Sequence, residues 1–212
     1  MMPQAPSLRP VLPRRRMLVS GAAVLLAGCS RVIGPTPMQL YRLDPPPAQP
    51  ADLPTVKWRL AVATPEAIAA LDSDRIALAR AATVFDYYAD AAWTDRAPSL
   101  VQALLVRRFE DTGRILAVSR DIDGLRIDYL LETDIREFTA RYESSGPPEI
   151  AVRIQAKLIR MPTREIVATL DADQRAAAGS NDVDAVVLAF GQALAAALDQ
   201  IVAWTLRTPA PA

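Results

Sequence analysis

The chain contains no histidine and one cysteine among its 212 residues, and these absences narrow the chemistry that it can perform. Without histidine there is no Ser-His-Asp or Cys-His arrangement, no imidazole base and no histidine ligand for a metal. A single cysteine forms no intramolecular disulfide and supplies no cysteine cluster for zinc or for iron and sulfur. Carboxylate or lysine chemistry is what remains open to an enzyme with this composition.

Lysine and glycine are also scarce. The two lysines, Lys57 and Lys157, lie in strand-like segments flanked by arginine or other polar residues. The eight glycines form no glycine-rich phosphate loop, and the chain contains no Gly-Lys-Ser/Thr step. If the protein works beside an ATPase, the ATPase must therefore be another chain.

Charge is unevenly distributed along the chain. Basic and acidic residues balance at 24 each, but residues 1–28 hold four arginines and no acidic residue. The rest of the chain is therefore mildly acidic, which argues against binding nucleic acid through a basic surface. A hydrophobic content of 51% over this length allows one domain with a buried core, and the 18 prolines indicate ordered loops and an extended linker.

Residues 1–28 have the layout of a lipoprotein signal peptide. Arg14, Arg15 and Arg16 form a charged n-region, and an uncharged apolar run follows over residues 17–27. This run is too short to span about 30 Å of hydrocarbon, but its length and flanks are typical of a secretory h-region. It ends in Leu-Ala-Gly-Cys at 26–29, which resembles a bacterial lipobox. Small residues let the chain enter the signal peptidase, and the cysteine thiol then takes the lipid.

The sequence thus predicts lipidation of Cys29, and two or three acyl chains there make a stable anchor. The alternative is that Cys29 is a buried cysteine at the end of a core helix. Ser30, rather than an aspartate, follows the cysteine, and the sorting logic of Gram-negative lipoproteins then predicts release to the outer membrane. The arginine triplet also resembles a twin-arginine signal, so the export route stays open.

The domain organisation predicted from these features has four parts. They are a signal peptide at 1–28, the lipidated cysteine and a proline-rich tether at 29–54, a periplasmic domain at 55–207 and a disordered tail at 208–212. Within the tether, imperfect apolar alternation predicts an edge strand at 39–43, followed by a semi-rigid polyproline loop at 44–55. The alternative is disorder up to residue 55.

Period-two alternation predicts strands through most of the domain. The expected strands lie at 58–63, 76–80, 83–88, 115–118, 125–135, 150–158 and 165–170. The segment from Leu125 to Leu170 is expected to be a three-stranded antiparallel meander. Along its first strand the apolar phase slips from odd to even positions, which predicts a bulge between Ile135 and Glu137.

Two helices are predicted from apolar spacings of three and four residues. The first runs from Asp95, as N-cap, to Asp111 and ends at Gly113, with Pro98 in its first turn. The paired Arg107 and Arg108 are assigned to its solvated face, with a site for an anionic ligand as the alternative.

The second helix runs from about 181 to 206, with Asn181 and Asp184 as a box-like pair at its start. Its apolar stripe is expected to pack on the sheet, with docking on a partner helix as the alternative. The stripe comprises Val183, Val187, Phe190, Leu194, Leu198 and Ile201. The fold class predicted from all elements is α+β, an antiparallel sheet of about five to six strands with two main helices packed on it.

The order of these segments resembles a known family. After the lipobox come the residues Tyr-Arg-Leu at 41–43, the strand at 59–62, the segment 71–77 and the segment 86–93 before an amphipathic helix. Together they resemble the auxiliary lipoprotein family of ABC-type transporters, which includes the PqiC-like proteins, over about residues 39–206. Members of that family tend to have a Trp followed by acidic-Pro-Leu, whereas the spacing after Trp93 is looser here.

The resemblance implies a role in lipid transport between the inner and outer membranes. Such a lipoprotein would be a non-enzymatic subunit without cofactor, metal or nucleic acid, anchored on the periplasmic face of the outer membrane. It would bind an MCE-domain protein and, through it, an ABC permease and ATPase. Docking on the lipid-conducting tube of the MCE protein would favour a homo-oligomeric ring.

Two other functions remain open from the residues. One is an outer-membrane lipoprotein that acts as a structural or assembly factor for an envelope complex. The other is an enzyme that uses carboxylates, and its candidate residues are Asp121, Asp123, Asp128, Glu132 and Asp134. The Asp-x-Asp-Gly at 121–124 resembles the opening of a calcium loop, but the strand-like residues that follow it favour a tight turn.

Overall fold

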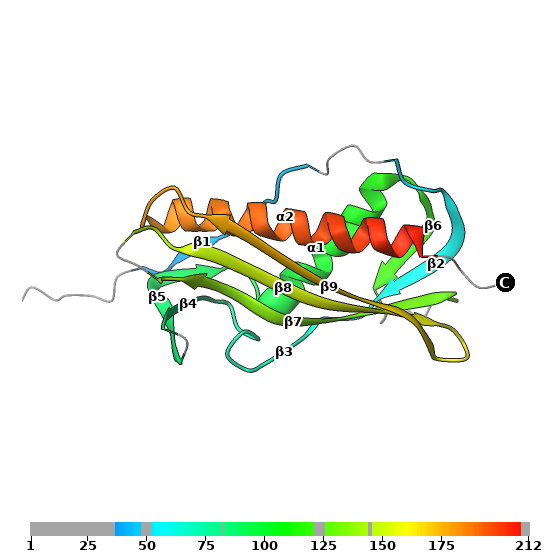
Figure 1. Ribbon diagram of the computed structural model, residues 1–212, viewed down its shortest axis with the longest axis horizontal. Coiled ribbons are helices and arrows are strands. Elements are labelled where there is room, and N and C mark those ends of the chain that lie inside the picture. Colours follow the sequence, from blue (N-terminus) through cyan, green and yellow to red (C-terminus); the bar gives the residue numbers. More distant parts are fainter. Residues whose placement is uncertain (1–36, 48–51, 82, 121–125, 144–145, 209–212) are drawn as a thin grey trace, which may run out of the picture. The chain divides into compact units, whose positions relative to one another are not determined.

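The computed structural model of the protein describes residues 37–47, 52–81, 83–120, 126–143 and 146–208. This part of the chain forms nine strands and two helices (Figure 1). In chain order they are β1 (Gln39–Tyr41), β2 (Val56–Val62), β3 (Glu66–Ala67), β4 (Arg75–Ala81), β5 (Val84–Trp93), α1 (Ala97–Thr112), β6 (Ile115–Arg120), β7 (Tyr129–Arg141), β8 (Glu149–Arg160), β9 (Glu165–Ala177) and α2 (Val183–Arg207).

The sheet is organised around β7. On one side of β7 lies antiparallel β8, followed by antiparallel β9. On the other side β2, β3 and β4 lie parallel to successive parts of β7, with Leu60 opposite Tyr129 near one end and Leu78 opposite Ala140 near the other. Beyond these, β6 pairs parallel with β2, β5 antiparallel with β4, and β1 parallel with β5. The sheet is therefore mixed.

The predicted α+β class with two helices agrees with the structure, but the predicted antiparallel sheet of five to six strands is wrong in strand number and in direction. Alternation reports which side chains of a strand are buried, and it carries no information about the direction of the neighbouring strand. Parallel pairing needs a long connection. Here the connection between β2 and β6 runs through β3, β4, β5 and α1.

The predicted antiparallel meander is confirmed as β7, β8 and β9, and its last strand extends further than expected, to Ala177. The predicted bulge is also present, because the register of β7 on β8 shifts between Ile135 and Glu137. Before the shift the odd position Leu131 is buried, and after it the even position Phe138 is buried. The bulge thus keeps one face of this long strand apolar.

Helix α1 begins at Ala97, one residue later than predicted. Its N-cap is Arg96, and the Asp95 carboxylate accepts a hydrogen bond of 2.7 Å from the Arg96 amide instead of capping the helix. The end of the helix agrees with the prediction. Gly113 takes the left-handed conformation, with φ of 59°, and its amide donates to the Glu110 carbonyl.

Helix α2 begins at Val183, after an N-cap residue Asp182 whose side chain makes no capping hydrogen bond. The predicted pair of Asn181 and Asp184 at the helix start is therefore wrong. Asp184 instead accepts a hydrogen bond of 2.8 Å from the Tyr41 hydroxyl. A residue far away in the sequence thus determines the role of this carboxylate, which no local pattern reveals.

The predicted apolar stripe of α2 packs on the sheet, because the helix contacts β8 and β9 (Figure 1). Its residues Leu194, Leu198 and Ile201 are fully buried, and Phe190 lies in an aromatic cluster at ring-centroid distances of 5.3 Å from Trp93 and 4.9 Å from Phe138. By length and composition α2 could also cross a membrane, but 61% of its most apolar window is buried inside the protein. In this fold it is the core helix.

Candidate functional site

The predicted lipidation site lies outside the described residues. Cys29 and the signal peptide before it precede Pro37, the first residue that the structure describes. Asp121 and Asp123, the first carboxylates of the calcium-loop hypothesis, fall in the gap at 121–125. Lipidation of Cys29 therefore stays a prediction. The candidate site in the described residues comprises the segment 37–47 and the surface of the sheet.

The part of the predicted tether that the structure describes, residues 37–47, is docked on the folded body. The edge strand expected at 39–43 is present as β1, with Leu40 opposite Ala92 of parallel β5. Leu43 is only 3% exposed and belongs to the hydrophobic core. The Tyr41 hydroxyl bonds to Asp184, and burial, with a smaller contribution from this hydrogen bond, raises the pKa of Tyr41. The segment 39–43 is thus fixed to both the sheet and α2.

Arg108 extends this attachment to α1. Its Nε lies 3.0 Å from the Asp199 carboxylate on α2, and its Nη2 donates a hydrogen bond of 2.9 Å to the Pro46 carbonyl. The assignment of Arg108 to a solvated face is therefore wrong, since the residue is 5% exposed. Arg107 does face solvent, because adjacent helical positions point about 100° apart.

A groove of about 700 Å³ opens between the β4–β5 hairpin, the segment before β4 and the C-terminal end of β7. One wall is mainly apolar and includes Ile68, Leu71 and Phe85. Ile68 is 63% exposed and Phe85 is 40% exposed, so this wall presents apolar surface to solvent. The sequence does not reveal the groove, because its walls come from three separate segments. The one available signal is that Ile68 and Phe85 are apolar residues outside every predicted apolar stripe.

The opposite wall of the groove is charged and is organised by Glu137. The Glu137 carboxylate accepts hydrogen bonds from the Arg141 guanidinium, one of them at 2.6 Å, and from the Thr139 hydroxyl at 3.2 Å. Arg175 of β9 lies 3.9 Å away from the same carboxylate. Arg136 also lines this wall. The groove is therefore amphipathic, with side-chain charges held in fixed positions along β7.

Hydrogen bonds of tyrosine hydroxyls hold the β4–β5 hairpin in place beside this groove. The Tyr88 hydroxyl lies 2.7 Å from the Tyr142 hydroxyl, and the Tyr87 hydroxyl donates to the Ala70 carbonyl at 3.1 Å. Burial, and secondarily the contact with Tyr142, raises the pKa of Tyr88 well above its usual range. The β4–β5 hairpin is thus attached to β7 on one side and to the segment before β4 on the other.

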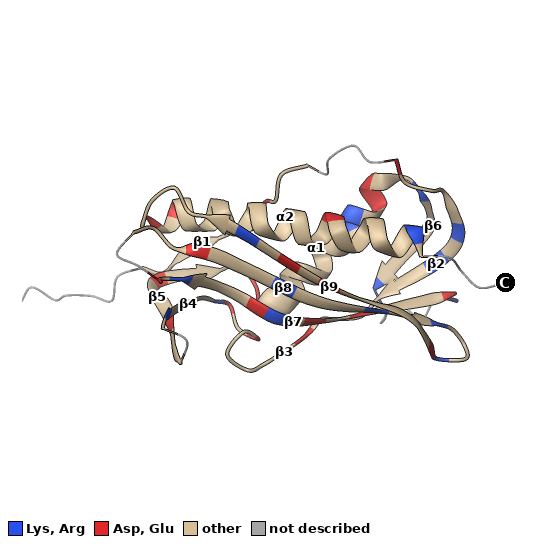
Figure 2. Ribbon diagram, in the orientation of Figure 1, with Lys and Arg blue, Asp and Glu red and all other residues tan. Residues whose placement is uncertain are grey.

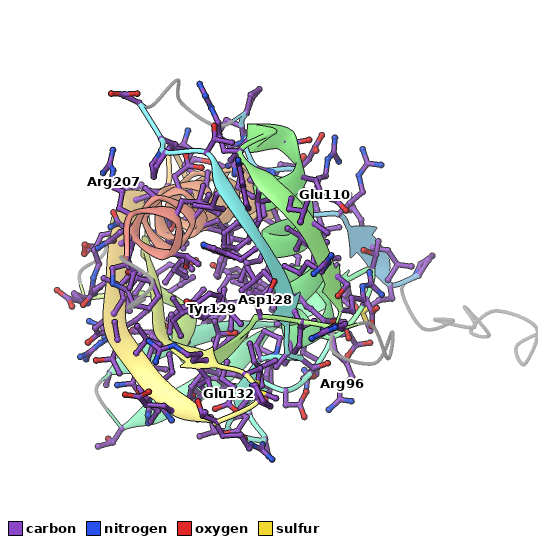
Figure 3. All side chains as sticks on the ribbon, turned by 90° about the vertical axis from the view of Figure 1, so that its right-hand side faces the viewer. Arg96, Glu110, Asp128, Tyr129, Glu132 and Arg207 are labelled. Atoms are coloured by element: carbon purple, nitrogen blue, oxygen red, sulfur yellow. The ribbon has the colours of Figure 1, made fainter. Side chains whose placement is uncertain are left out.

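Two of the carboxylates proposed for an enzyme, Asp128 and Asp134, are engaged by neighbouring groups. Asp128 accepts a hydrogen bond of 2.8 Å from the Arg59 amide, and Asp134 lies 2.9 Å from the Arg136 guanidinium. Figure 3 shows Asp128 at the start of β7 and Glu132 further along it. Within the described ranges, no three Asp, Glu or Cys side chains form a group that could hold a metal ion.

Strands β7, β8 and β9 carry charged residues of both signs (Figure 2), which pair as Arg141 with Glu137 and as Arg153 with Asp171. Across β8 and β9, Arg153 pairs with both carboxylate oxygens of Asp171 at 3.0 Å. The hydrogen bonds from Arg153 lower the pKa of Asp171. Paired charges of this kind keep an open sheet face solvated and discourage non-specific association.

Comparison with known proteins gives the fold a family. The sequence model of the ABC-type transport auxiliary lipoprotein component matches residues 41–202. The protein bll6063 of Bradyrhizobium diazoefficiens is 29% identical over 187 residues, which cover 86% of this chain and 49% of that protein. The chain therefore spans about half the length of this relative.

Solved structures agree with the family match. Protein XCC0632 from Xanthomonas campestris is 33% identical, with a TM-score of 0.76 over 80% of this chain and 95% of that one. A second crystal structure, of an uncharacterized protein, has a TM-score of 0.61 at 13% identity and covers 77% of this chain and 95% of its own, so it shares the fold. From the family match and the structural similarity together, the chain belongs to the ABC-type transport auxiliary lipoprotein family.

Proposed function

We propose that this protein is a non-enzymatic, lipid-anchored subunit of an ABC-type lipid transport system that links the inner and outer membranes. The observation that carries the proposal is the family match over residues 41–202, downstream of the lipobox at 26–29. Cys29 carries the lipid and holds the domain on the periplasmic face of the outer membrane. ATP hydrolysis belongs to another chain, because this sequence contains no phosphate-binding loop.

The partner in this proposal is an MCE-domain protein, which connects the lipoprotein to the permease and the ATPase. The groove beside the β4–β5 hairpin supports the proposal, since Ile68, Val84 and Phe85 expose apolar side chains in this region. An apolar centre beside fixed charges is the usual composition of a specific protein interface. Docking on a tube of symmetric subunits also favours a homo-oligomeric ring of this chain.

The anchor is tested by labelling growing cells with radioactive palmitate. The parent chain should incorporate the label, and Cys29→Ala should lose it, because the thioether needs the thiol. Ser30→Ala is the matched control, since it changes the neighbouring residue and keeps the thiol. Label that persists in Cys29→Ala would contradict lipidation at this residue.

The partner is tested by affinity capture of the membrane-extracted chain. We expect the parent to recover an MCE-domain protein, and Phe85→Gln to recover several-fold less of it. Leu188→Gln is the matched control, because Leu188 is an exposed apolar residue on α2, away from the groove. Recovery of envelope-assembly proteins alone would instead favour the structural or assembly lipoprotein.

A further inference from the structure

Strand β1 and the residue just before it present two exposed apolar side chains, Leu40 and Met38. Successive side chains of a strand alternate between its faces, and the Tyr41 side chain points to α2, where it bonds to Asp184. Leu40 therefore points the other way. Leu40 is 63% exposed and Met38 is 58% exposed. Arg42, just after β1, has a side chain that is 77% exposed, and its guanidinium lies 3.8 Å from the similarly exposed carboxylate of Asp44.

The covalent distance from Cys29 limits where this surface can lie. Met38 is nine residues after Cys29, and a fully extended chain of that length spans at most about 30 Å. The strand itself is fixed to the body, by pairing with β5 and by the bond from Tyr41 to α2. A lipid on Cys29 therefore keeps Met38 within about 30 Å of the lipidated residue, so Met38 and Leu40 can reach the membrane surface.

We propose that Met38, Leu40 and Arg42 form a second, non-covalent contact with the bilayer that holds the lipidated Cys29. The two apolar side chains enter the interfacial region of the bilayer, and the Arg42 guanidinium lies among anionic lipid headgroups. The acyl chains on Cys29 already make a stable anchor, so the second contact orients the domain on the bilayer. This inference rests on the proposed lipidation of Cys29.

Other exposed apolar residues do not share this position. Ile166 is 55% exposed, but it lies at the start of β9, opposite Ile159 of β8, beside the N-terminal end of β7. β1 lies at the other end of β7, because it joins β7 through β5 and β4 (Figure 1). The contact therefore orients the domain, with the β1 end at the lipid surface and the β8–β9 turn away from it.

The test uses the full mature chain, purified from membranes and reconstituted in phosphatidylethanolamine and phosphatidylglycerol vesicles. The lipid on Cys29 occupies its thiol, so a Leu40→Cys variant offers one free thiol for a nitroxide label. Electron paramagnetic resonance then measures collisions of the label with oxygen, which concentrates in lipid, and with a water-soluble nickel chelate. Gln39→Cys and Ile166→Cys serve as matched controls on the opposite side of β1 and on β9.

We expect the Leu40 label to collide several-fold more with oxygen relative to nickel than either control label does. Equal ratios at Leu40 and Ile166 in a lipidated chain would overturn the membrane contact and leave the anchor intact. Reduced collisions with both reagents at Leu40 would also overturn it, since they indicate cover by protein, from a second copy or another segment. Mass spectrometry that finds Cys29 unmodified would overturn the anchor and this inference together.

A second variant tests the headgroup interaction. In Arg42→Glu, labelled at Leu40→Cys, the oxygen preference should fall in phosphatidylglycerol vesicles, because the new carboxylate repels anionic headgroups. The same pair of substitutions in vesicles of phosphatidylcholine alone should show a smaller difference from the parent arginine. An Arg42→Glu effect of equal size in both lipids would contradict the role assigned to Arg42.

Discussion

The guanidinium of Arg108 on α1 lies 3.0 Å from the carboxylate of Asp199 on α2 and also holds the Pro46 carbonyl. One side chain thus connects the two helices with the segment that leads from β1 toward the β2 strand. Together with the hydrogen bond from Tyr41 to Asp184, the Arg108 contacts make the segment 37–47 part of the folded body.

Removal of the Arg108 side chain should destabilise the protein. Arg108→Met leaves the Pro46 carbonyl without its donor and takes a buried cation away from Asp199, so we expect a loss of about 2–3 kcal/mol in the free energy of unfolding. Urea denaturation measures it. Arg107→Met is the control, and we expect a change within about 0.5 kcal/mol, because the Arg107 side chain is solvent-exposed. Equal effects of the two substitutions would refute the structural role of Arg108.

The aromatic cluster should carry a large share of the packing energy. Phe190→Ala creates a cavity between Trp93 and Phe138, and we expect it to cost about 3–5 kcal/mol. Leu188→Ala, two residues away on the same helix, should cost little, because Leu188 is 69% exposed. Denaturant midpoints report both variants, and the near-ultraviolet circular dichroism of the aromatic residues, Trp93 among them, reports any loss of packing. A small loss in Phe190→Ala would mean that the cluster is loosely packed.

Gly113 should be needed for its backbone conformation rather than for space. Its φ is 59°, and a Cβ added there would meet no atom within 4 Å, so the cost of Gly113→Ala comes from the left-handed conformation alone. We expect about 1 kcal/mol. Gly179→Ala is the control, since Gly179 also has free space around its Cα and does not take a left-handed φ. A neutral Gly113→Ala would show that α1 ends differently.

Stability should fall at alkaline pH because of Tyr88. Burial raises the pKa of Tyr88 in the folded state, so the folded protein keeps this proton while the unfolded chain releases it near pH 10. The contribution is fully present below pH 10 and decreases as the pH rises above it. Urea midpoints measured at increasing pH should therefore fall more steeply for the parent than for Tyr88→Phe. Parallel curves would contradict burial of the neutral phenol.

Much of the meander and of the helices could be predicted from local patterns. The alternation of residues 150–158 reports a strand with one buried face, and its observed partners on both sides are antiparallel. The phase slip before Phe138 located the bulge, and Gly113 located the end of α1. These features are local because they depend on side-chain period and on backbone conformation within a few residues.

The features that local patterns missed depend on long-range contacts. Arg108 and Arg107 have the same chemistry, and which of them turns inward is decided by where α2 and Pro46 lie. The carboxylate of Asp184 was predicted to cap α2, but it accepts a hydrogen bond from the Tyr41 hydroxyl of β1. The groove beside Phe85 exists because three segments meet there, and no segment shows it alone.

The sequence by itself determined the chemistry that is excluded, the lipobox with its prediction for Cys29, the class of fold and the positions of most elements. These follow from composition and from periodicity, which are properties of the chain before it folds. The tertiary structure decided the direction of β2, β3 and β4 against β7, and the docking of β1 and Pro46 on the helices. Strand direction and burial of a charge depend on which distant residues the connections bring together, and a linear pattern does not contain that information.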